Sequence, residues 1–80
     1  MPMAPFKNVD YGSRISAIRA VATALGAPNT AIPSQSASPD DMHCWKWLAV
    51  LYGLNGLANP YSIDFGSFTS AINKLAAKVP

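Results

Sequence analysis

The residues best suited to chemistry in this 80-residue chain are its only histidine and its only cysteine, His43 and Cys44, neighbours in the stretch HCWKW. An imidazole that reaches a thiol can activate it as a nucleophile. Adjacent residues on a helix point about 100° apart, so a helix through this stretch separates the two side chains. A cysteine on the apolar side of a helix is usually a small buried hydrophobe. We therefore predict no nucleophilic pair here, and one histidine with one cysteine also falls short of the ligands of a closed zinc site.

The acidic side chains give no sign of catalysis either. The chain contains no glutamate, and its four aspartates are Asp10, Asp40, Asp41 and Asp64. Each aspartate lies near a predicted helix start, where a carboxylate caps backbone N–H groups and interacts favourably with the helix dipole. The sequence also holds no glycine-rich phosphate loop and no Gly-x-Ser-x-Gly turn. We predict that the protein is not an enzyme and that it binds neither a metal nor a cofactor.

The stretch that contains His43 belongs to a helix predicted over residues 39–54. Ser38 suits the N-cap, where its oxygen accepts from a backbone N–H, and Pro39 suits the first helical position, where no N–H is needed. Acidic residues follow in the first turn. This helix therefore has the clearest predicted start in the sequence.

Two further segments carry the periodicity of amphipathic helices. The first covers residues 13–25 and is ended by Gly26, a residue that favours the conformation at a helix C-terminus. The other covers residues 64–78, with Asp64 or Ser62 as its predicted cap. No segment alternates apolar and polar residues over the length of a strand.

The predicted fold is all-α: a small three-helix domain with an extended N-terminal arm and a long connector. Residues 1–12 form the arm, because they contain prolines and lack helical periodicity. Residues 13–80 form a single helical domain. The connector between the first two helices, residues 27–38, is rich in proline and serine, and loops of this length are usually mobile or functional.

The composition predicts more apolar surface than so small a domain can hide. Half of the residues are hydrophobic and 12% are charged, against about a quarter charged in ordinary soluble domains. Apolar side chains cover about three quarters of the circumference of the helix over residues 39–54. Only a strip with Met42, His43, Lys46 and Gly53 is left for water. The other two predicted helices present narrower apolar faces, so part of this surface should meet another protein.

We therefore predict a small subunit that acts by protein–protein contact, with a partner or by self-association, inside a larger assembly. A minor structural component of a virus particle is one example. Aromatic residues are enriched where interfaces are strongest. The candidate partner-binding residues are Trp45, Trp47, Leu51, Tyr52, Phe6 and Tyr11.

Two alternatives remain open. The first is a nucleic-acid-associated regulatory module, although the net charge of +2 is small and the basic residues are scattered along the chain. Its phosphate contacts would come from Arg14, Arg19, Lys46, Lys74 and Lys78. The second is a carrier of an apolar ligand, with Trp45, Trp47 and His43 lining a pocket between helices.

The sequence also suggests where the protein works. The first residues, MPMAPFK, lack the apolar stretch of a secretory signal peptide, and no apolar run approaches the roughly 20 residues that span a bilayer. A single cysteine cannot form a disulfide within the chain. We expect an intracellular protein or one held within an assembled particle.

Overall fold

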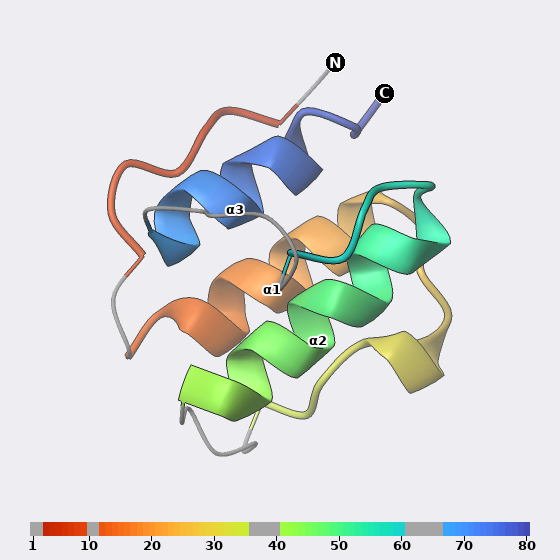
Figure 1. Ribbon diagram of the computed structural model, residues 1–80, viewed down its shortest axis with the longest axis horizontal. Coiled ribbons are helices and arrows are strands. Elements are labelled where there is room, and N and C mark those ends of the chain that lie inside the picture. The colour runs from red at the N-terminus through yellow and green to blue at the C-terminus, as the bar shows by residue number, and fades with distance from the viewer. Residues whose placement is uncertain (1–2, 10–11, 36–40, 61–66) are drawn as a thin grey trace.

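The computed structural model describes residues 3–9, 12–35, 41–60 and 67–80, and the regular secondary structure within these ranges consists of helices (Figure 1). The predicted all-α architecture of three helices is confirmed. The first helix, α1, covers Arg14–Ala24, and a short 3-10 helix, η1, follows at Asn29–Ala31. The longest helix, α2, covers Asp41–Leu54, and α3 covers Phe68–Ala76.

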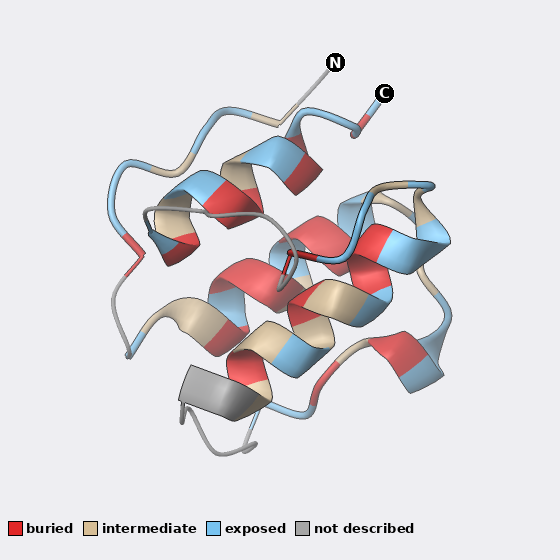
Figure 2. Ribbon diagram, in the orientation of Figure 1, coloured by how far each residue is buried: buried red, intermediate tan, exposed pale blue. Residues whose placement is uncertain are grey.

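Side chains from all three helices meet in one core. α1 contacts both α2 and α3, and Figure 2 shows the buried segments of the helices turned toward one another. Because α1 and α3 cover one side of α2, the opposite side of α2 faces outward. Among the residues that the structure describes, the largest fully buried aliphatic side chains are Ile18, Val21, Leu48, Leu51, Ile72 and Leu75.

The end of α1 directs the chain toward α2. Gly26 has a φ of 72°, in the left-handed region that glycine adopts without strain. The N–H of Gly26 donates to the Thr23 carbonyl at 3.1 Å and that of Ala27 to the Ala22 carbonyl at 3.0 Å. These paired hydrogen bonds satisfy carbonyls at the helix end. The chain then enters η1, which contacts α2.

The start of α3 differs from the prediction. Ser67 is the N-cap, with extended backbone at φ −159° and ψ 158°, and its hydroxyl oxygen accepts from the Ser70 N–H at 3.1 Å. Extended backbone cannot belong to a helix, so the predicted start near Asp64 is wrong and α3 begins at Phe68. The proposed caps Ser62 and Asp64 lie outside the described residues, as does the predicted start of α2 at residues 38–40.

The N-terminal arm lies along α3 (Figure 1). The Asn73 carboxamide holds the arm at Phe6: its Oδ1 accepts from the Phe6 N–H at 2.7 Å, and its Nδ2 donates to the Phe6 carbonyl at 2.8 Å. The Val9 N–H donates to Thr69 Oγ1 at 3.0 Å. Side chains of α3 thus hold the main chain of the arm through hydrogen bonds.

Candidate functional site

The outward side of α2 carries large apolar side chains that the domain leaves uncovered. Val50 is 48% exposed and Leu54 is 55% exposed. Lys46 and Gly53 are exposed on the same side of the helix. Every other large aliphatic side chain of the described residues is buried or partly buried. Of the surface that the structure describes, this side of α2 is therefore where contact with another molecule would remove the most exposed aliphatic side-chain surface from water.

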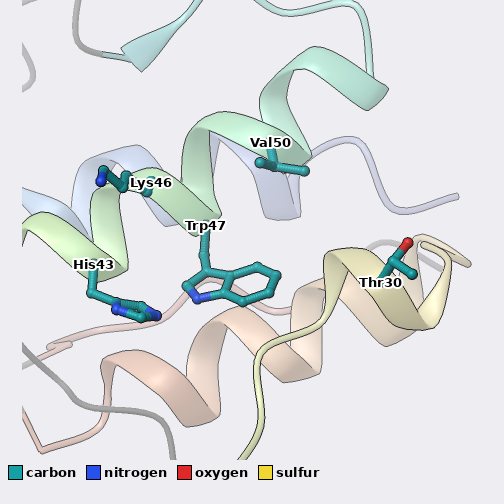
Figure 3. Close-up of a pocket in the computed structure, with 5 residues that line it drawn as sticks. All are labelled: Thr30, His43, Lys46, Trp47 and Val50. Atoms are coloured by element: carbon teal, nitrogen blue, oxygen red, sulfur yellow. The ribbon is translucent and has the colours of Figure 1, made fainter.

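A shallow pocket of about 390 Å³ adjoins these residues, and its lining residues are Thr30, His43, Lys46, Trp47 and Val50. Figure 3 shows His43 and Trp47 pointing from α2 to the same side, with Thr30 supplied by η1. The rings of His43 and Trp47 are 6.2 Å apart between centroids and tilted by 33°. We call the pocket together with Leu54 the α2–η1 surface.

Hydrogen bonds within the connector hold η1 at the edge of this pocket. The Ala31 N–H donates to the Pro28 carbonyl at 2.8 Å, which closes the 3-10 turn around Thr30. The Arg19 guanidinium of α1 donates to the Pro33 carbonyl at 2.6 Å, and Pro33 is itself fully buried. The connector is therefore fastened on both sides of Thr30, so this wall of the pocket forms part of the folded domain.

The neighbours His43 and Cys44 face different surroundings. Cys44 is fully buried in the core, whereas His43 is half-buried and lines the pocket. The separation expected from helical geometry is confirmed, and no thiol reaches the pocket beside the imidazole. Among the described residues, no three histidine, cysteine, aspartate or glutamate side chains gather as metal ligands.

Two of the predicted partner-binding residues lie in the core of this structure. Leu51 and Tyr52 are fully buried by the chain's own helices, so neither is available to a partner. The Tyr52 hydroxyl donates to the Ala71 carbonyl of α3 at 2.6 Å. Burial disfavours the phenolate and raises the pKa of Tyr52 to about 12. Tyr52 is therefore a structural link between α2 and α3.

The two tryptophans lie in different places. Trp45 is half-buried and packs edge-on against Phe68 of α3, with ring centroids 5.2 Å apart. Trp47 is half-buried beside His43 at the pocket. The hypothesis of an apolar-ligand carrier placed both indoles in one pocket, and that arrangement is absent from the described structure. Of the two, Trp47 alone lies on the α2–η1 surface.

The remaining candidate for partner binding, the arm, is only partly described. Phe6 is half-buried where its main chain is held by Asn73. Its ring is packed against the core. Tyr11 lies outside the described residues. The arm thus covers this chain's own α3.

The basic residues of the nucleic-acid hypothesis occupy different environments. The Arg14 guanidinium lies 4.6 Å from the centre of the Phe68 ring, and Arg19 holds the Pro33 carbonyl, so both arginines contribute to the fold. Lys46 is exposed on α2, whereas Lys74 and Lys78 are exposed on or just beyond α3. Two of the five cations therefore make contacts that stabilise the domain itself.

Comparisons with protein-family models, curated proteins and solved structures found no match. No helix of the described residues is long and apolar enough to cross a membrane.

Proposed function

We propose that the protein is a small, non-enzymatic helical subunit that acts by protein–protein contact within a larger assembly. The contact is made by the α2–η1 surface. A virus particle is one such assembly, and the protein would be a minor structural component of it. This proposal keeps the protein-contact hypothesis and its candidate Trp47, and it replaces the buried Leu51 and Tyr52 with the exposed Val50 and Leu54.

The observation that carries the proposal is the uncovered apolar stripe on α2. Trp47, Val50 and Leu54 follow one another at intervals of three and four residues, which places them along one side of the helix. That spacing is the one by which helices dock on one another. Removing apolar surface from water contributes roughly 25 cal/mol per Å², so a partner that covers this stripe gains binding energy that the isolated domain lacks.

The pocket adds shape to that stripe. Its volume of about 390 Å³ can receive an apolar side chain of a partner, and the half-buried indole of Trp47 provides an aromatic wall. Trp side chains in such positions often dominate interface energies. Lys46 at the rim adds a polar boundary, as is usual around an apolar interface centre.

A matched pair of glutamate substitutions tests the proposal. Leu54→Glu places a charge on the α2–η1 surface, whereas Thr23→Glu places the same charge at an exposed position of α1. Both positions are exposed, so both variants should keep the circular dichroism and melting temperature of the wild type within the small range of surface substitutions. The two variants therefore differ mainly in which surface they alter.

In cells that make the protein, we expect the wild type and Thr23→Glu to elute in a complex larger than the single chain. Leu54→Glu should elute mainly as the single chain, because a charge in an apolar contact is costly to desolvate. Native size-exclusion chromatography with mass detection measures the size of the complex for each variant. Retention of Leu54→Glu in the complex, or elution of the wild type as a single chain, would overturn the proposal.

A further inference from the structure

We infer that the protein covering the α2–η1 surface is a second copy of the same chain, joined through an antiparallel contact between the two α2 helices. This inference rests on the proposed function and specifies its partner. It follows from a hollow and a projecting side chain that lie on the same side of one helix.

The hollow has the geometry by which one helix receives a side chain of another. The four α2 residues that line the pocket occupy positions i, i+3, i+4 and i+7, and Thr30 closes one side. In knobs-into-holes packing, a side chain of the facing helix enters a hole formed by four residues with this spacing. The four residues are His43, Lys46, Trp47 and Val50.

The projecting side chain is Leu54, which at 55% is the most exposed of the large apolar side chains that the structure describes. Leu54 follows Val50 by one helical turn and does not line the pocket. A hole and a knob on the same side of one helix are complementary under two-fold symmetry, since each copy then offers what the other receives. A parallel pair would align Leu54 with Leu54 and leave both holes empty.

The antiparallel arrangement also determines the other contacts. When Leu54 of one copy enters the hole of the other, it lies beside the Trp47 indole. The Val50 side chains of the two copies then meet near the two-fold axis, because Val50 lies about midway along α2 between Leu54 and the centre of the hole. The exposed apolar residues of both copies are thereby covered together.

Gly53 also fits this arrangement. A glycine inside a helix costs roughly 0.5–1 kcal/mol relative to alanine. Gly53 does not adopt a positive φ, and a Cβ built there would meet nothing within 4 Å, so neither backbone nor packing requires glycine. Gly53 lies two turns beyond Lys46 on the same side of α2. In the antiparallel pair, this glycine leaves room for the lysine stem of the second copy.

The charges permit the same pairing. Lys46 carries the only permanent charge among the residues of the α2–η1 surface, and the whole chain carries a net charge of +2. In the antiparallel register the two Lys46 positions are separated by about 12 Å along the helix axis, which exceeds the Debye length of about 8 Å in physiological salt. A parallel pair would place the two ammonium groups side by side.

Sedimentation equilibrium of the purified full-length chain, from micromolar to millimolar concentration, tests the inference. We expect a reversible monomer–dimer equilibrium for the wild type and for Thr23→Ala. Leu54→Ala removes the knob and Gly53→Leu fills the space for Lys46, so each should weaken dimerisation by at least about tenfold. Melting curves of the same samples verify that both variants are folded.

An oxidation experiment distinguishes the antiparallel pair from other dimers. Val50→Cys places two thiols near the two-fold axis, where mild oxidation should give a disulfide-linked dimer, whereas Thr23→Cys should give no disulfide-linked dimer. Cys44 is fully buried in the wild-type fold, so it should not take part in the disulfide of either variant. A wild type that stays monomeric at millimolar concentration overturns the inference. So does a dimer that persists in Leu54→Ala and Gly53→Leu, or one that Val50→Cys fails to link.

The two proposals can fail separately. If the purified wild type is monomeric but Leu54→Glu still releases the chain from a larger cellular complex, the contact surface is correct and its partner is another protein. If the wild type is monomeric both when purified and in cells, both proposals are wrong.

Discussion

Leu51→Ala is expected to lower the free energy of unfolding by about 2–5 kcal/mol, the usual cost of removing a fully buried leucine side chain. Leu51 lies on α2, and its side chain is fully buried. A domain of this size has a total stability of roughly 4–12 kcal/mol, so this one substitution removes a large share of it. Urea titration followed by circular dichroism at 222 nm measures the loss.

Leu54→Ala is the matched control, because it makes the same chemical change three residues later on the same helix. Leu54 is 55% exposed, so its replacement should cost less than about 1 kcal/mol in the monomer at low concentration. Equal losses for the two variants would show that the inner and outer sides of α2 have been assigned incorrectly.

The second large effect is a loss of stability at alkaline pH that depends on Tyr52. The pKa of Tyr52 in the folded protein is raised to about 12 by burial, whereas a tyrosine in an unfolded chain ionises near pH 10. Between these values the unfolded state releases a proton that the folded state retains. The contribution of Tyr52 is therefore fully present below about pH 10 and falls by about 1.4 kcal/mol per pH unit up to about pH 12.

Tyr52→Phe isolates this effect, because it removes the titrating group and keeps the ring. The variant should lose about 1 kcal/mol at neutral pH, since the hydrogen bond to the Ala71 carbonyl is gone. Its stability should then fall less steeply than that of the wild type between about pH 10 and pH 12. Urea titrations of both proteins at a series of pH values measure the difference. Identical alkaline slopes would contradict the assigned burial of the hydroxyl.

Helical periodicity and helix-ending residues were sufficient to predict the fold class. The apolar spacing of Ile15, Ile18 and Val21 predicted α1, and Gly26 ends it with the expected left-handed backbone. The start of α3 was predicted less well. Asp64 or Ser62 was predicted as its cap, and Ser67 was not considered as one. In the structure the hydroxyl oxygen of Ser67 accepts from the Ser70 N–H.

The candidate site could be predicted only in part, because periodicity shows that a helix is apolar on many sides but not which side its neighbours cover. The sequence indicated that α2 carries excess apolar surface. The candidates that it named on α2 were Trp45, Trp47, Leu51 and Tyr52. Leu51 and Tyr52 are buried in the structure, whereas the exposed Val50 and Leu54 were not among the candidates. That choice depends on contacts between helices distant in the sequence. Thr30 was missed because its position depends on the folding of the connector onto α2.

The central claim is that the chain meets another protein through the α2–η1 surface. A photo-crosslinking amino acid at position 50, with the same group at position 23 as control, tests it most directly in cells that make the protein. We predict covalent adducts from position 50 and none from position 23, with the adduct of position 50 mapping to the α2 helix of a second copy. Adducts at position 23 alone, or none at position 50, would contradict the claim.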